Sequence, residues 1–263
     1  MNCLITFAVV FSIIIVDTYE SFGFKQLKKL SVTEKRTIED VVDVEEFEID
    51  STQPCPVIEC VVVTDGHVSQ HFSEERIKTD VKEAVRLIQE EYLDELELNL
   101  TLRLIGHIFY TNETEPDYIK ESLYNLKTIA GNILSNMRAI KDHPLVSRAD
   151  AVVLLTTRDV ILYLPKPEEE PSYIGGLAYV GTACNPDYKF ALALFSHLMQ
   201  YMVDTFIHEL GHLININHDW EAKNCSPKLL PGKKRYSYCA KKGVTEFLDT
   251  HSCFLDHCDN GEK

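Results

Sequence analysis

Four side chains within one short stretch could bind a metal ion and activate water. His208 and His212 are four positions apart, so on a helix both imidazoles lie on one face and can bind the same ion. Glu209 is one position round the helix from His208 and can reach a water molecule on that ion. His218 follows six positions after His212, so the chain must leave the helix and turn back. We place this turn at Asn215, because asparagine tolerates the left-handed conformation that often ends helices.

The chemistry that these side chains favour is hydrolysis assisted by zinc. Three neutral imidazoles leave one position of a tetrahedral zinc ion for water, and the ion lowers the pKa of that water to about 7. Glu209 would accept the proton as the water attacks a carbonyl carbon, and would pass it to the leaving amine. The sequence therefore predicts one catalytic zinc ion, held by His208, His212 and His218.

An amphipathic helix that starts upstream must position this motif. Its core-facing side is predicted to carry Phe195, Leu198, Met199, Met202, Val203, Phe206, Ile207 and Leu210. The neighbouring stripe holds His197, Tyr201, Asp204, His208 and His212, at the border of core and cleft. His197 would lie roughly 16 Å from His208 along the helix, too far to bind the same ion. We interpret it as a surface histidine, together with His67, His71, His107 and His143.

The pattern from Pro56 onwards is typical of an α/β fold. Ser73 can cap a long helix, and the alternation from Leu98 to Leu104 predicts a half-buried strand. A second long helix is predicted from Pro116 to Met137. The apolar run Ala151–Leu155 indicates a central strand covered on both faces. Three prolines and three glutamates between residues 165 and 171 predict an exposed loop.

The pattern HExxHxxxxxH resembles that of the metzincin metalloproteases, and Asp219 after the third histidine resembles their reprolysin (adamalysin) branch. Three further segments are similar to that family's first strand, central strand and substrate-facing edge: Ile58–Asp65, Ala149–Thr156 and Gly176–Cys184. The resemblance covers roughly residues 56 to 258. It implies a metzincin-type α/β fold with a twisted, mainly parallel sheet, long helices, a zinc cleft and an irregular C-terminal subdomain held by disulfides.

The resemblance also implies a function. We expect a secreted zinc endopeptidase that cleaves protein or peptide substrates with Glu209 as general base, similar to stand-alone venom or salivary enzymes of arthropods. The substrate would pair with the edge formed by Gly176, Leu177, Ala178 and Tyr179. Two departures stand out: Asn215 replaces the family's glycine, and no methionine follows Met202, so Tyr236 is predicted beneath the zinc instead. They support an alternative, a catalytically weak or inactive binding protein or toxin that acts through surface contacts.

Cysteines and acidic residues add further candidates. Without Cys3, which lies in a predicted signal peptide, the chain has Cys55, Cys60, Cys184, Cys225, Cys239, Cys253 and Cys258. The resemblance implies a bridge from Cys184 to Cys253 or Cys258, with Cys225 to Cys239 as a candidate second bridge. Cys55 could pair with Cys60, remain free, or bind zinc in a latent form. Glu59 and Asp150 match positions that bind calcium in reprolysins, which makes Ca²⁺ a candidate second ion.

Composition indicates one secreted domain. The chain has 263 residues, is 45% hydrophobic and carries a net charge of -15, which argues against nucleic acid and anionic membrane surfaces as partners. The apolar run of residues 4–16 is typical of a signal peptide, with a retained anchor as the alternative. We therefore predict a signal peptide at 1–20, a short pro-segment or tail at 21–55, and a metalloprotease domain at 56–263. No later run reaches membrane-spanning length, and we expect a monomer.

Three Asn-x-Ser/Thr sequences are candidate glycosylation sites, as expected of a secreted glycoprotein. Asn112 lies in a polar loop and is the strongest of them. Asn99 lies in the predicted strand and Asn224 beside a cysteine, so both are weaker candidates.

Overall fold

The computed structural model describes residues 43–47, 56–166, 169–221, 225 and 228–255. The predicted signal peptide, most of the 21–55 segment, Cys55, Asn224 and Cys258 lie outside these residues. Within the described ranges, no helix is both long enough and apolar enough to cross a membrane.

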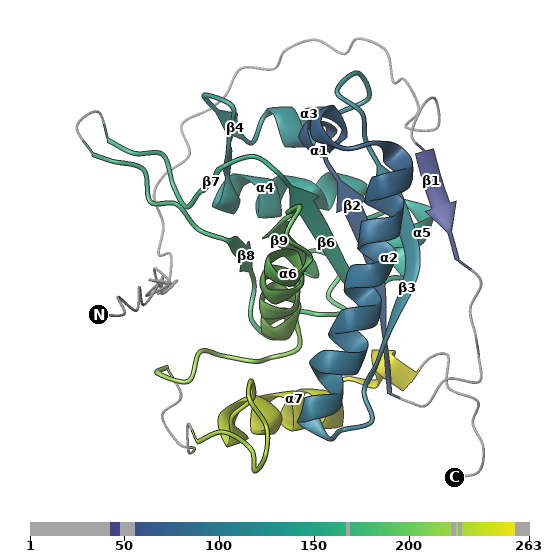
Figure 1. Ribbon diagram of the computed structural model, residues 1–263, viewed down its shortest axis with the longest axis vertical. Helices are drawn as coiled ribbons and strands as arrows, with labels where there is room; N and C mark the ends of the chain where they lie inside the picture. The colour runs from purple at the N-terminus through teal and green to yellow at the C-terminus, as the bar shows by residue number, and fades with distance from the viewer. Residues whose placement is uncertain (1–42, 48–55, 167–168, 222–224, 226–227, 256–263) are drawn as a thin grey trace, which may run out of the picture.

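Six strands form one mainly parallel sheet, which confirms the predicted α/β fold (Figure 1). Their spatial order is β1 (Asp43–Glu46), β3 (Thr101–Phe109), β2 (Val57–Thr64), β6 (Ala151–Thr156), β9 (Phe190–Leu194) and β8 (Gly176–Ala178). The four inner strands run parallel, whereas β1 and β8 pair antiparallel at the two edges. Every residue of β6 is buried, as predicted for a central strand covered on both faces.

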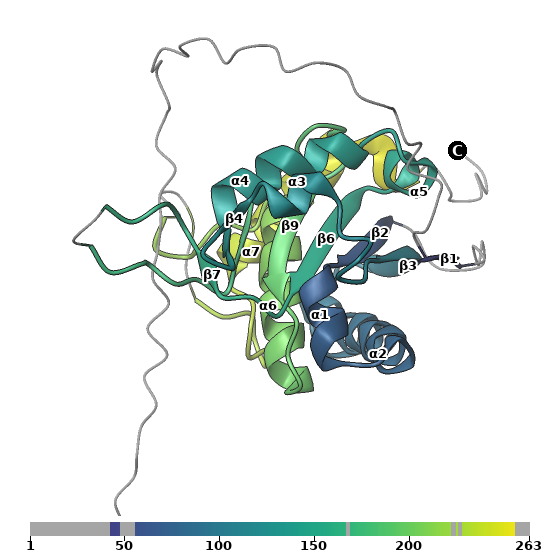
Figure 2. The same ribbon diagram turned by 90° about the horizontal axis from the view of Figure 1, so that it is seen from above.

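Helices cover both faces of the sheet (Figure 2). One face carries α1 (Gly66–His71), α2 (Glu74–Glu91) and α6 (Met199–Leu213), and the other carries α3 (Asp117–Lys120), α4 (Ala130–Asn136) and α5 (Pro144–Arg148). Short 3₁₀ turns follow at η1 (Leu93–Leu96) and η2 (Met137–Ile140). Strand β2 divides the core because its side chains alternate: Ile58 and Val62 join the first cluster, Val61 and Val63 the second.

Two predicted elements are present in the structure, and one of them differs from the prediction in its first residue and its burial. Helix α2 is capped by the Ser73 hydroxyl, which accepts the Arg76 N–H, and its apolar face is buried as predicted. The strand expected at Leu98–Leu104 begins at Thr101 and is almost fully buried, because β1 and β2 flank it in the sheet.

His107 on this strand is only 1% exposed, so its interpretation as a surface histidine was wrong.

The predicted long helix after Pro116 is wrong. Helix α3 ends at Lys120, and strands β4 (Leu123–Tyr124) and β5 (Lys127–Ile129) follow before α4 begins. Asn125 and Leu126 between these strands have φ of 47° and 64°, the left-handed pair that a tight hairpin turn needs. The helical spacing of apolar residues there was therefore coincidental. With β7 (Val160–Ile161), the hairpin forms a three-stranded sheet.

The C-terminal subdomain contains α7 (Tyr238–Thr250), η3 (Ser252–Leu255) and two disulfides. Cys184 is bonded to Cys253 and Cys225 to Cys239, which agrees with the predicted pairs. Cys60 is free and buried in β2, so the alternative bridge from Cys55 to Cys60 is wrong. Helix α7 was not expected in this subdomain, although Ala240, Val244 and Phe247 repeat at helical spacing and are buried.

Candidate active site

The structure brings three histidine side chains together at the C-terminal end of α6. His208 and His212 lie one turn apart on that helix, with ring centroids 4.7 Å apart. The ring of His218 lies 5.2 Å from that of His208 and 4.7 Å from that of His212. One nitrogen of each ring lies within 4.8 Å of the other two. These are the three residues that the sequence predicted as zinc ligands.

The return of His218 depends on how α6 ends. Asn215 has φ of 72°, the left-handed conformation predicted from its sequence position. The amide of Asn215 donates to the carbonyl of His212 at 2.9 Å, and the amide of Ile216 donates to the carbonyl of Gly211 at 2.8 Å. This pair of bonds is a Schellman motif, which reverses the chain direction and allows His218 to face the helix.

Hydrogen bonding and burial favour neutral imidazoles at this site. Nδ1 of His212 lies 2.7 Å from the carbonyl oxygen of Ile216. Because a carbonyl can only accept, Nδ1 carries the proton and the lone pair of Nε2 is left for a metal. Burial lowers the pKa of His208 to about 4, and His212 and His218 act in the same direction. Burial also lowers the pKa of His212.

The spacing of the nitrogen atoms fits a zinc ion. Two imidazole nitrogens that bind one tetrahedral zinc at about 2.0–2.1 Å lie roughly 3.3 Å apart. Nε2 of His208 and Nε2 of His218 lie 3.2 Å apart. Nδ1 of His218 faces Oε2 of Glu221 at 3.5 Å, a carboxylate placed to hold that ring in orientation. The donor set therefore suits zinc both in chemistry and in geometry.

Glu209 is buried beside the histidines, with 5% of its surface exposed. Burial raises the pKa of its carboxyl group to about 8. Its carboxylate also lies against strand β8: a Cβ atom added at Gly176 would be 2.7 Å from both Cγ and Oε1 of Glu209. The candidate base thus follows His208 on α6 and lies against the sheet edge.

Strand β8 forms the edge of the sheet next to α6 and contains Gly176, Leu177 and Ala178. Within the described residues it pairs with β9 on one side only, so its other side can accept an extended chain. Tyr179 follows directly after the strand and packs edge to face on Tyr188. Three of the four predicted substrate-facing residues therefore form the edge strand, with Gly176 against Glu209, and Tyr179 follows the strand.

Comparison with known proteins agrees with this geometry. The model of the family described as "Metallo-peptidase family M12B Reprolysin-like" matches residues 78–219, more than half of the chain. The chain belongs to this family. It is a zinc metalloendopeptidase with the metzincin fold.

The similar proteins include scorpion venom enzymes. Venom metalloproteinase antarease-like TserMP_B of Tityus serrulatus is 27% identical over 235 residues, which cover 78% of this chain and 98% of that protein. Venom metalloproteinase BumaMPs1 of Olivierus martensii is 25% identical over 232 residues, which cover 80% of this chain and 57% of that protein. The archaemetzincin structure from Methanopyrus kandleri aligns with a TM-score of 0.45 at 15% identity, covering 74% of this chain and 97% of that one. This chain thus spans nearly all of the first relative and under two thirds of the second.

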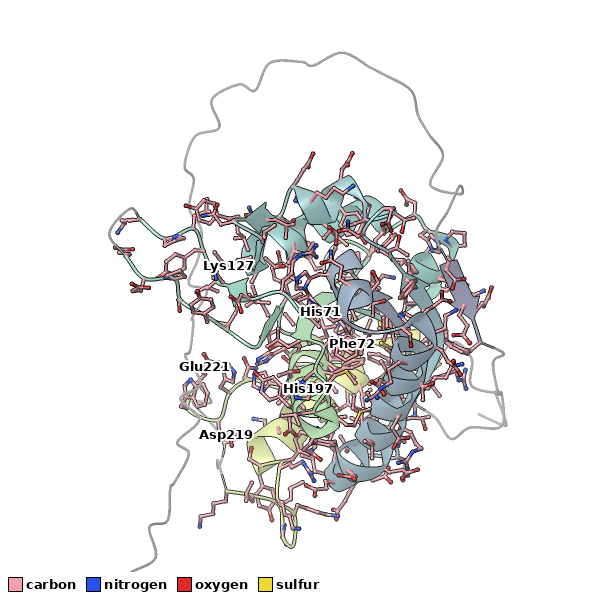
Figure 3. All side chains as sticks on the ribbon, turned by 45° about the horizontal axis from the view of Figure 1, so that its top comes forward. His71, Phe72, Lys127, His197, Asp219 and Glu221 are labelled. Carbon is pink, nitrogen blue, oxygen red and sulfur yellow. A yellow bond between two sulfur atoms is a disulfide. The ribbon has the colours of Figure 1, made fainter. Side chains whose placement is uncertain are left out.

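The reprolysin-like Asp219 connects the third histidine to the C-terminal subdomain. The Ser237 hydroxyl donates to Oδ1 of Asp219 at 2.5 Å and accepts the Ala240 N–H at the start of α7. Asp219 and Glu221 lie on the loop after α6, whereas the exposed His197 lies apart from them (Figure 3). Ser237 was not among the predicted residues, although a serine directly before the apolar repeat of α7 is a typical helix cap. Tyr236 is buried in the core; its predicted role beneath the zinc stays a prediction.

The candidate calcium residues lie side by side in the structure. The backbone amide of Glu59 donates to Oδ2 of Asp150 at 2.8 Å. The guanidinium of Arg103 lies 3.3 Å from Oε1 of Glu59 and supplies a positive charge there. Cys184 and Cys253 also lie near Asp150, but their disulfide removes the thiolates that a metal would need. Calcium binding by Glu59 and Asp150 stays a prediction.

The candidate glycosylation residues within the described ranges are both exposed. Asn112 lies in the loop after β3, as expected. Asn99 lies in a loop before β3 with φ of 50°, so its predicted location inside a strand was wrong. Its exposed position makes it a better candidate than its sequence context suggested.

Proposed function

We propose that this metalloendopeptidase is secreted and hydrolyses protein substrates with zinc held by His208, His212 and His218. The observation that carries this proposal is the buried carboxylate of Glu209, which follows the ligand His208 on α6 and lies against the edge strand β8. A purely structural zinc site would need no acid–base group at this point.

The side chains have separate tasks in the proposed reaction. Zinc at the three imidazoles would lower the pKa of a bound water to about 7 and polarise the substrate carbonyl. Glu209 accepts the proton of the attacking water and donates it to the nitrogen of the leaving amine. Burial alone raises the pKa of Glu209 and makes it a stronger base, and the positive charge of a bound zinc ion would oppose this shift and keep the group ionised to accept the proton. His212 keeps its orientation through the hydrogen bond to Ile216.

The edge strand suits an extended peptide as substrate. Backbone hydrogen bonds from Gly176, Leu177 and Ala178 would hold a polypeptide of almost any sequence, with Tyr179 at the end of this row. Gly176 allows the substrate backbone and Glu209 to approach each other closely, since it has no side chain between them.

Secretion is supported by the two disulfides of the C-terminal subdomain, which are stable in oxidising compartments. We propose the signal peptide at 1–20, a short pro-segment or tail at 21–55, and glycosylation at Asn112. The acidic strand β1 lies within the proposed pro-segment or tail and is part of the sheet.

The test measures zinc content and cleavage of a diverse peptide library by pure protein and by Glu209→Gln. The glutamine keeps the size of the side chain but cannot accept the proton, so zinc should remain while turnover falls about 10²–10⁴-fold. Glu246→Gln, an exposed carboxylate on α7, is the matched control and should leave both unchanged. A chelator should abolish cleavage, and added zinc should restore it.

The alternative is a binding protein or toxin that acts through surface contacts. It draws on Asn215 in place of glycine and on the lack of a methionine after Met202. If zinc-loaded protein cleaves no peptide and Glu209→Gln keeps the biological effect, the enzyme mechanism fails and this alternative replaces it.

A further inference from the structure

Strand β1 adds an acidic edge to the sheet on the side away from the zinc cleft. It pairs antiparallel with β3, from Asp43 opposite Phe109 to Glu46 opposite Gly106. The amide of Phe47 donates to the carbonyl of Ile105 at 3.1 Å and extends this ladder. β1 and β8 lie at opposite ends of the strand order and on opposite sides of the molecule (Figure 1).

Basic side chains from two helices hold the acidic residues of β1. Nζ of Lys78 lies 2.7 Å from Oδ2 of Asp43, and Nζ of Lys82 lies 2.7 Å from Oε1 of Glu45. Both lysines belong to α2. From α5, Arg148 contributes Nη2, which lies 2.7 Å from Oε1 of Glu46. Three ion pairs thus hold one four-residue strand, in a chain whose net charge is -15.

The contact depends little on apolar burial. Val44, the apolar residue within β1, is 39% exposed, and Nζ of Lys82 lies 4.7 Å above the ring of Phe47. Glu45 lies directly opposite the buried His107. Among the described residues, Oε2 of Glu45 and Nδ1 of His107 are both buried without a hydrogen-bond partner. Neither atom helps to hold the strand, which is held by backbone pairing and by the three ion pairs.

We propose that the β3 edge, flanked by Lys78, Lys82 and Arg148, is a binding site for an acidic extended peptide. Its occupant is residues 43–47 of the same chain, held by backbone pairing and charge rather than by their covalent connection to β2. A chain cut between β1 and β2 keeps the strand bound, and the bound strand leaves the cleft at β8 open. Binding at this edge is separate from the proposed catalysis.

The test uses the full chain with a recognition sequence for a site-specific protease introduced between residues 48 and 55. After cutting, size-exclusion chromatography at low salt should recover the N-terminal fragment with the domain, and 1 M salt should release it. A labelled peptide of residues 41–49 should then rebind, as measured by fluorescence anisotropy. Peptide cleavage at the zinc site should change less than about two-fold on release.

Variants separate charge recognition from simple strand pairing. Lys82→Ala and Arg148→Ala should each weaken peptide binding about two- to five-fold, the range of a surface ion pair. Lys242→Ala, an exposed lysine of α7 far along the chain from β1, is the matched control and should not change it. A peptide with Asn, Gln and Gln in place of Asp43, Glu45 and Glu46 loses all three ion pairs. Its affinity for the wild-type domain should be lower than the affinity of the acidic peptide for Lys82→Ala or for Arg148→Ala.

Three results would overturn the proposal. Loss of the fragment directly after cutting at low salt would mean that β1 needs its covalent connection. If the peptide with Asn, Gln and Gln binds as tightly as the acidic peptide, and 1 M salt does not weaken the binding of the acidic peptide, charge is not recognised. A dimer that disappears when β1 is deleted would assign the edge to a second copy of the chain.

Discussion

The carboxylate of Glu209 lies against the backbone of Gly176, so a side chain of any size at Gly176 would occupy the space of the candidate base. A Cβ atom there would be 2.7 Å from Oε1 of Glu209 and 2.4 Å from the carbonyl oxygen of Leu192. Helix α6 and strand β8 are therefore fitted to each other at the point where the proposed proton transfer takes place.

Gly176→Ala should lower kcat/KM about 10²-fold while zinc stays bound, because the added methyl group displaces Glu209 and distorts β8. Peptide cleavage and zinc content measured on the same sample check this. Gly131→Ala is the matched control, since a Cβ at this helical position meets no atom within 4 Å. Normal activity of Gly176→Ala would mean that Glu209 has another position available.

Asn215→Gly should destabilise the protein by about 1 kcal/mol. Glycine adopts the left-handed conformation freely, but the variant loses the bond that Nδ2 of Asn215 donates to the carbonyl of Gly243 at 3.0 Å. Asn215→Ala should cost about 1 kcal/mol more, because alanine is strained at this φ. Urea unfolding of both variants measures these values. An Asn215→Gly variant as stable as the wild type would show that the amide contact with α7 contributes nothing.

Arg158→Met should destabilise the fold by about 3–5 kcal/mol, because it leaves two buried carboxylates without their partner. Nη1 of Arg158 lies 2.5 Å from Asp65 and 2.9 Å from Glu115, and all three side chains are at most 5% exposed. Denaturant unfolding compares it with Arg76→Met, whose side chain is 54% exposed in its pair with Asp80 and should cost under about 1 kcal/mol. Equal losses in the two variants would argue that solvent reaches the Arg158 cluster.

Stability should fall as the pH drops from about 6.5 towards 4, in part through His107. Burial lowers the pKa of His107 from 6.5 to about 4. Between these values the unfolded chain binds a proton that the folded chain does not. The contribution of neutral His107 to the free energy of unfolding is therefore complete above pH 6.5 and is lost as the pH falls towards 4. The shift corresponds to about 3 kcal/mol at most.

The measurement compares denaturant unfolding at pH 7.5 and pH 4.5 for the wild type and His107→Gln, both free of zinc. The glutamine variant should lose less stability between these pH values. Asp43, Glu45, Lys78 and Lys82 act on the pKa of His107 through their charges in the wild type, and the glutamine variant has no titrating group at this position. His197→Gln, an exposed histidine, is the control and should follow the wild type. Parallel losses in His107→Gln and the wild type would contradict the assignment.

Local patterns in the sequence determined much of the candidate site. The four-residue spacing of His208 and His212 puts both on one helix face, because helix geometry depends only on neighbouring residues. Asn215 predicted the helix end, and the conformational preference of a single residue type was enough for that. The family resemblance supplied the fold and the candidate pair Cys225–Cys239, but it left Cys184 with two possible partners, of which the structure has Cys253. Local patterning failed at Pro116–Met137, where two left-handed residues outweighed an apolar spacing typical of a helix.

Only the tertiary structure decided how distant segments meet. Nothing near Glu209 in the sequence indicates that its carboxylate lies against Gly176, and nothing near His107 indicates that β1 covers it. Ser237 reaches Asp219 only because α7 packs below the end of α6. These contacts depend on strand order and register, which are set when the whole chain packs its two core clusters. The residues that form these contacts are far apart in the sequence. No short stretch of sequence therefore contains both partners, and no local pattern can predict that they meet.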